Sequence, residues 1–158
     1  MRRTAVVLAL LLLAAAGALA ATRADFDRVV DFSVTLKTLA AAAAGTQPLP
    51  TGKMIMLTGT VSSVTIVNKD PATFQARIEL ITGEWFGLDD VKAYSCYVDF
   101  SGQEFFATFP ARAPAQPGPD VVLQNARVLV AGRAVTVVTT PLGDKRVVVD
   151  GASIRVIE

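Results

Sequence analysis

The sequence contains no histidine, and this absence removes several kinds of chemistry. A Ser-His-Asp triad, a Cys-His pair and a histidine metal site are all excluded. The adjacent carboxylates Asp89 and Asp90 lack the alternating oxygen ligands of a calcium loop. The glycine pair in residues 83–87 lacks the lysine and the following helix of a phosphate-binding loop. We therefore predict that the protein is not an enzyme and has no catalytic residues, no metal and no cofactor.

Cysteine is almost as scarce, because Cys96 is the only one. An intramolecular disulfide is impossible, so stability has to come from a hydrophobic core. Cys96 alternates in phase with Tyr94 and Val98, which is typical of the buried face of a strand. We predict that it is a buried apolar residue and not a reactive thiol.

The N-terminus has the pattern of a secretory signal peptide. Arg2 and Arg3 precede an apolar run over residues 5–13, and small residues follow up to an A-x-A motif at residues 18–20. Cleavage is predicted before Ala21, which indicates a periplasmic or secreted protein of the bacterial cell envelope. A retained membrane anchor is the alternative, but half of the apolar span is alanine or glycine, which is weak for a bilayer core of about 30 Å.

The charge of the predicted mature protein is close to balanced. Loss of Arg2 and Arg3 leaves 13 of the 15 basic residues against 14 acidic ones, a net charge of −1. Non-specific nucleic-acid binding depends on neutralising several phosphates with lysine and arginine. We therefore expect nucleic acid to be an unlikely partner.

Residues 53–67 carry an alternating apolar pattern that changes phase once. Apolar residues alternate with polar ones as far as Val61 and resume at Val64, one residue out of step. A one-residue slip turns side chains to the other face of a sheet. A single continuous strand with a β-bulge near Ser62 and Ser63 keeps both apolar sets buried.

Gly59 lies in the first half of this strand and predicts a bend there, because a residue without Cβ allows close approach of another backbone. A bent and bulged strand is able to serve two sheets at once, which is how a small barrel turns its corner. We predict a barrel over residues 53–158.

The rest of the chain supplies the other elements in order. Periodicity predicts one helix over residues 25–44, which either plugs the barrel or binds a partner or a membrane surface. A proline-containing linker at residues 45–52 follows it. Alternation and turn residues predict further strands at residues 74–80, 92–100, 127–138 and 145–157, an extended piece at 103–109 that pairs with the third strand, and a proline-rich surface loop at 110–119.

This order is that of an all-β chain with one N-terminal helix and a five-stranded OB-type Greek-key barrel. The stretches MIMLTGTVSSVTI, SCYVDF, RVLVAGRAVTVV and RVVVDGASI resemble the tRNA-anti-like group of exported bacterial OB-fold proteins, whose functions are mostly unassigned. Two features depart from that group: the proline-rich loop replaces its usual helix, and the helix at 25–44 lies outside its barrel. The domains implied are a signal peptide at 1–20, a helix and linker at 21–52 and the barrel at 53–158.

An OB-fold binds ligands on the exposed face of its second and third strands and on the loops after its first and fourth strands. We expect an exported, non-catalytic binding module for a small or oligomeric ligand, or alternatively an envelope interaction protein that uses the helix or a barrel edge. Trp85 and Phe86 belong either to the site or to a lid over the core. The predicted ligand-binding residues are Arg77, Tyr97, Lys69, Trp85, Phe86, Lys145 and Arg146.

Overall fold

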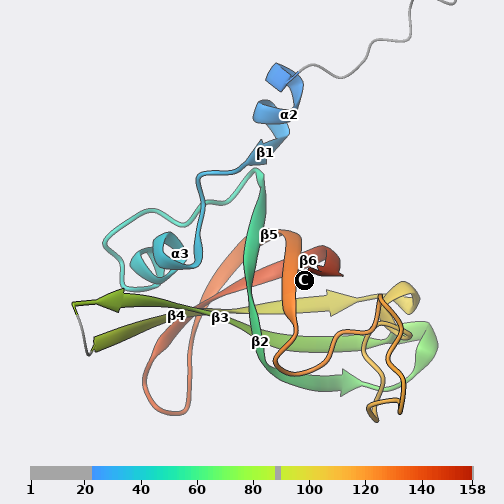
Figure 1. Cartoon of the computed structure of the whole chain (residues 1–158). Helices are drawn as coiled ribbons and strands as arrows, with labels where there is room; N and C mark the ends of the chain where they lie inside the picture. The colour runs from blue at the N-terminus through green and yellow to red at the C-terminus, as the bar shows by residue number, and fades with distance from the viewer. Residues whose placement is uncertain (1–22, 88–89, 158) are drawn as a thin grey trace, which may run out of the picture.

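Five strands form a closed barrel in the computed structural model, which describes residues 23–87 and 90–157 (Figure 1). Strand β2 pairs with β3, β3 with β4, β4 with β6, β6 with β5, and β5 again with β2. The β4–β6 pair is parallel, and the other four pairs are antiparallel. This is the OB fold, as predicted. The strands are β2 (Met54–Asn68), β3 (Gln75–Phe86), β4 (Asp90–Ser101), β5 (Arg127–Thr139) and β6 (Lys145–Val156).

Strand β2 serves both sides of the barrel. Its first half pairs with β5 as far as Thr60, and its second half, from Thr60 onward, pairs with β3. The register of the second pairing shifts between Val61 and Ser63, which confirms the predicted bulge. At Gly59 a Cβ would lie 2.8 Å from the carbonyl oxygen of Ile81, so only glycine fits without displacement.

The prediction of a single helix over residues 25–44 was wrong. The chain forms α2 (Arg23–Val29), the two-residue strand β1 (Val30–Asp31) and α3 (Leu36–Ala43). The Asp31 carboxylate accepts hydrogen bonds from the backbone N–H and the hydroxyl of Ser33, at 2.9 and 2.6 Å, and this turn ends the first helix. Thr35 and Thr38 then form a reciprocal capping box that starts the second.

The two short helices have different environments. Helix α3 packs on β4 and β6 and inserts Leu36, Leu39 and Ala43 into the core, so this half of the predicted helix plugs the barrel. Helix α2 extends away from the barrel (Figure 1), and its Phe26 and Val29 side chains are exposed. Among the residues described, no helix is both long enough and apolar enough to span a membrane.

The prediction that residues 103–109 are extended was also wrong. These residues form the 3-10 helix η2 (Gln103–Phe105) and further turns, with the N–H of Phe109 bonded to the carbonyl of Phe105 at 3.1 Å. The helical spacing turns Phe105 and Phe109 to one side, where both pack against Phe100 in the core. Residues 110–119 carry no helix or strand, as predicted.

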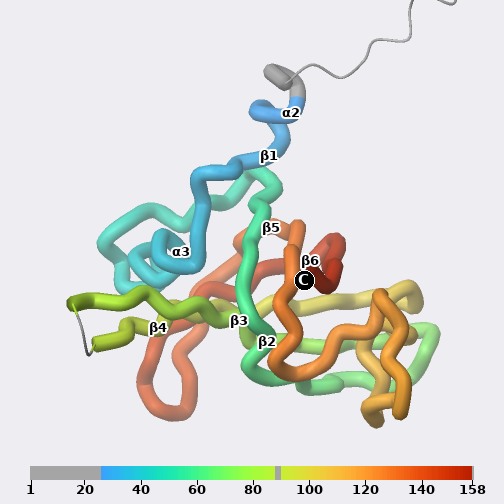
Figure 2. The backbone as a smooth tube through the Cα atoms, viewed as in Figure 1, coloured from blue at the N-terminus to red at the C-terminus, as the bar shows by residue number. Residues whose placement is uncertain are grey.

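The connections between strands lie at two ends of the barrel. The β2–β3 turn, with the 3-10 helix η1 (Pro71–Thr73), lies on the right in Figure 2, together with the loop from β4 to β5. The β3–β4 hairpin and the β5–β6 hairpin lie on the left. The predicted ligand-binding residue Lys69, in the β2–β3 turn, is therefore separated by the length of the barrel from Trp85 and Phe86 at the β3–β4 hairpin.

Candidate functional site

Strand register brings three of the predicted residues together on the outer face of the barrel. Arg77 of β3 lies opposite Asp99 of β4, next to Tyr97 on the same face. Tyr97 in turn lies beside Val148 of β6. Since side chains alternate along a strand, Arg146 shares the face of Val148. We call this surface, formed by Arg77, Tyr97 and Arg146, the outer face.

The guanidinium of Arg77 forms an ion pair with Asp99, its neighbour on this face. Its Nε and Nη2 atoms bond the two carboxylate oxygens of Asp99 at 2.6 and 2.7 Å. The hydrogen bond with Asp99 raises the pKa of Arg77. The same guanidinium lies 5.3 Å from the centre of the Tyr97 ring. Arg77 therefore holds the ring of Tyr97 in place and offers little free charge to a ligand.

Strands β3 and β4 continue past the barrel as a two-stranded arm. The last pair between β2 and β3 is Thr60 with Ile81, whereas β3 and β4 remain paired as far as Phe86 and Asp90. We call residues 82–86 and 90–94 the arm.

The arm exposes the two aromatic residues near its tip. Trp85 is 72% exposed and Phe86 44% exposed, so the alternative in which they form a lid over the core was wrong. The physical reason is that β2 leaves β3 before these positions, so no core lies beneath them. Trp85 alternates in phase with Glu79 and therefore continues the outer face, while Phe86 points to the opposite side of the arm.

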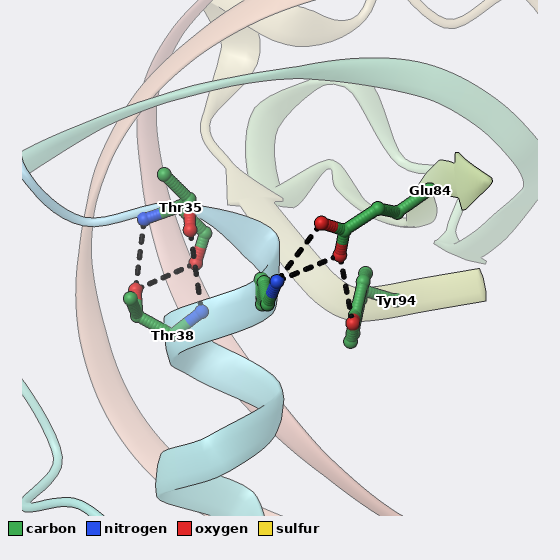
Figure 3. A network of polar contacts seen from close by, with 5 residues as sticks. Thr35, Thr38, Glu84 and Tyr94 are labelled. Atoms are coloured by element: carbon green, nitrogen blue, oxygen red, sulfur yellow. Dashed lines mark hydrogen bonds and ion pairs between the residues drawn. The ribbon is translucent and has the colours of Figure 1, made fainter. Parts of the chain in front are cut away.

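The inner side of the arm is tied to α3 by a polar cluster (Figure 3). The Nζ atom of Lys37 lies 2.8 and 2.9 Å from the two carboxylate oxygens of Glu84, and the Tyr94 hydroxyl donates to the same carboxylate at 3.0 Å. The hydrogen bonds from Lys37 and then Tyr94 lower the pKa of Glu84. Burial and the hydrogen bond to Glu84 raise the pKa of Tyr94.

Phe86 belongs to this inner side, with Lys37 Nζ 5.8 Å from the centre of its ring. Sequence reasoning missed the cluster, because Lys37 and Glu84 lie 47 residues apart and no local pattern connects them.

The remaining predicted residues lie elsewhere. Lys69 lies in the β2–β3 turn, at the end of the barrel opposite the β3–β4 hairpin (Figure 2), and lines an apolar cavity of about 300 Å³ with Phe74 and Phe106. Lys145 precedes Arg146 and points to the other side of β6 by alternation. Neither residue contributes to the outer face.

The described part of the chain contains no group of three His, Cys, Asp or Glu residues placed to hold a metal ion. The Cys96 thiol is fully buried, as predicted, and burial raises its pKa to about 12. The candidate site therefore consists of aromatic and charged groups on an open surface.

Comparison with known proteins identifies structural likeness only. No protein-family model matches the chain, and no curated protein matches it. The small single-stranded DNA-binding protein of Streptomyces coelicolor superposes with a TM-score of 0.41 and 13% identity, over 66% of this chain and 91% of that one. A Plasmodium falciparum SSB in complex with ssDNA superposes with a TM-score of 0.43 and 14% sequence identity, over 66% of this chain and 94% of that one. At these identities the likeness bears on the fold alone.

The expectation that nucleic acid is an unlikely partner has to be corrected, because the fold is one that two single-stranded DNA-binding proteins also have. Their names assign no ligand to this chain. The expectation relied on the net charge of the whole chain, whereas a ligand meets the groups on one face. Stacking of bases on aromatic rings also contributes to binding without a net positive charge.

Proposed function

We propose that the chain is an exported, non-catalytic binding module whose ligand is a single-stranded nucleic acid, held along the outer face and the arm. The observation that carries the proposal is Trp85, which is 72% exposed near the tip of the arm, on the side that continues the outer face. A large aromatic side chain in that position contributes nothing visible to the packing of the barrel. It is suited to contact with a planar group from outside.

The spacing of the rings supports a ligand that is a chain. Tyr97 lies opposite Glu79, six residues before Trp85 along β3. At about 3.3 Å per residue the two rings are roughly 20 Å apart along the sheet. A single strand of several nucleotides spans that distance, and stacking is typically worth about 1–3 kcal/mol per base.

The charges of the outer face indicate that stacking dominates over phosphate contacts. Arg77 is paired with Asp99, and Nη2 of Arg146 lies 3.4 Å from the carboxylate of Asp144. Few cations are left for phosphates. Because the salt dependence of affinity scales with the number of phosphates neutralised, we expect a shallow dependence.

Fluorescence anisotropy with labelled single-stranded DNA and RNA, at about 50 and 200 mM salt, tests the proposal. Binding should weaken in Trp85→Ala and again in the Trp85→Ala, Tyr97→Ala double variant. Phe26→Ala is the matched control, because Phe26 is an exposed aromatic residue on α2, outside the site. Absence of binding, or binding that the double variant leaves unchanged, would reject the proposal.

Export and the lack of catalysis rest on the sequence. The signal-peptide pattern falls in residues 1–20, which lie outside the described residues, and the missing histidine and lone cysteine supply the argument against catalysis.

A second candidate function is attachment to an envelope protein through α2. Phe26 and Val29 are 56% and 55% exposed on α2, which extends away from the barrel (Figure 1). Two exposed apolar side chains one helical turn apart favour contact with another surface. Affinity capture from cell envelopes should recover a defined protein with the unmodified chain and lose it with Phe26→Ser, Val29→Ser. Equal recovery with both chains would reject this candidate.

A further inference from the structure

The barrel is closed, but beyond their last shared pair, Thr60 with Ile81, strands β2 and β3 diverge and leave two strand edges unpaired with each other. Upstream of Thr60, β2 pairs with β5 on one side only, apart from the short β1 contact at Met54 and Ile55. Downstream of Ile81, β3 pairs only with β4. Among residues 23–87 and 90–157, no strand pairs with residues 56–59 of β2 or residues 82–86 of β3 on the sides that face each other.

These two strand edges leave backbone groups free to bond a ligand. Along a strand edge, alternate residues direct their N–H and C=O groups outward, and an edge without a partner is a template for another strand. The two edges meet at Gly59 and Ile81, where the strands come closest, and separate toward Met56 and Glu84. The space between them is a wedge with main chain on both walls.

Two adjoining cavities occupy this wedge. The larger, of about 400 Å³, lies at the wide end and is lined by apolar side chains of Phe32, Leu36 and Met56 together with Glu84 and Tyr94. The smaller, of about 230 Å³, lies at the narrow end beside Arg127. Both are lined by Thr58, Thr82 and Gly83, so they form one groove. None of the residues of the outer face lines it.

One strand of the protein itself already pairs with this edge of β2. Strand β1 pairs in parallel with β2, Val30 with Met54 and Asp31 with Ile55. Since Ile55 also pairs with Gly132 of β5, β1 must lie on the side that faces the groove. The groove begins at the next residue, Met56. An extended polypeptide is therefore the kind of molecule that this edge accepts.

The charges indicate the composition of the occupant. At the wide end Lys37 is neutralised by Glu84. At the narrow end Arg127 has an exposed side chain and no ion pair among the described residues. An apolar side chain suits the larger cavity, and an acidic group suits Arg127.

We propose that the groove between β2 and β3 binds an extended peptide segment of a partner protein as an added strand, with an apolar side chain in the larger cavity and an acidic residue near Arg127. Main-chain hydrogen bonds to the free edges supply affinity and the cavity supplies selectivity. This site is separate from the proposed nucleic-acid surface.

Selection from a phage-displayed library of random octapeptides tests the proposal. The mature protein should enrich peptides that Thr58→Arg fails to bind, because the arginine side chain fills the groove at the junction of both cavities. Thr65→Arg is the matched control, since Thr65 is also an exposed threonine of β2 but lies in the half paired with β3 and lines neither cavity. Tyr97→Ala should keep peptide binding, which separates this site from the outer face.

A synthetic copy of an enriched peptide then tests the binding mode. It should slow amide hydrogen exchange in residues 82–86, and N-methylation of alternate residues should weaken binding about tenfold or more for each pair of hydrogen bonds removed. Failure to enrich any peptide sensitive to Thr58→Arg overturns the proposal, as does equal binding of the N-methylated peptide. Concentration-dependent dimerisation that protects the same amides would assign the edge to a second copy and would also overturn it.

Discussion

At the scale of single residues, Cys96 shows how burial determines reactivity. The thiol lies within the core between β3 and β6, and burial raises its pKa to about 12. Since the thiolate is the reactive form, native protein should not react with Ellman's reagent at neutral pH. The same protein in denaturant should react with one equivalent of reagent. Rapid labelling of native protein would show that β4 opens or that the thiol is accessible.

A second prediction concerns the carboxylate of Glu84. Its pKa is lowered by hydrogen bonds from Lys37 and Tyr94, so its ionised form favours the folded arrangement. That contribution is present above the ordinary carboxyl pKa and is lost as pH falls through the lowered value. Amide exchange in residues 82–86, corrected for its intrinsic pH dependence, should therefore accelerate on acidification. Glu84→Gln should lack this acid step, and an identical step in the variant would contradict the assignment.

Residue positions were predictable where alternation alone decided them. Cys96 follows the period of its strand, and its burial was therefore correctly predicted. The exposure of Trp85 depends on where β2 leaves β3, a long-range event that no window around residue 85 contains. The pairing of Arg77 with Asp99 likewise depends on the register between two strands.

At the scale of elements, β2 depends on glycine at its closest approach to β3. Gly59→Ala places a methyl group against the Ile81 carbonyl oxygen and the Leu80 side chain. We expect a loss of about 1–3 kcal/mol in the free energy of unfolding, as for other overpacked sites, measured by urea denaturation. Gly118→Ala is the control, because nothing lies within 4 Å of its Cβ position. Equal stability of the two variants would show that the close approach does not exist.

The elements that were predicted correctly are those whose pattern is local and sustained. The bulge in β2 follows from a change of phase within one strand. The N-terminal helix was predicted as one piece because Val29, Phe32 and Leu36 keep helical spacing across the break. The break between the two helices is decided by the hydrogen bonds of the Asp31 side chain and by the capping box at Thr35. Such side chains occur both within one long helix and between two short ones, so the sequence alone does not place the break. In residues 103–109 the alternation of apolar and polar side chains is weak. This pattern does not distinguish a strand from helical turns that bury Phe105 and Phe109.

At the scale of the whole molecule, the proposal of export makes a prediction about processing. Expression in a Gram-negative host should yield a periplasmic protein whose intact mass corresponds to a chain that begins at Ala21. Arg2→Asp, Arg3→Asp should reduce export, because the positive n-region is lost. A full-length protein that remains in the cytoplasm or in the membrane would contradict the proposal.

The architecture was predictable because five strands, a bulge and the turn residues agree on one barrel. The candidate surfaces were less predictable, since the outer face depends on the register of β3, β4 and β6 and the groove on the divergence of β2 and β3. Residues as far apart as Lys37, Thr58 and Glu84 meet there.

The most direct test of the binding surface uses the fluorescence of Trp85, the only tryptophan in the chain. Titration of the mature protein with unlabelled oligothymidine should quench this emission in a saturable manner, because a base stacks on the exposed ring. Tyr97→Ala should shift the midpoint to higher oligonucleotide concentration while leaving the starting emission unchanged. Emission that stays constant while labelled oligonucleotide binds in a parallel assay would place the ligand elsewhere and contradict the account.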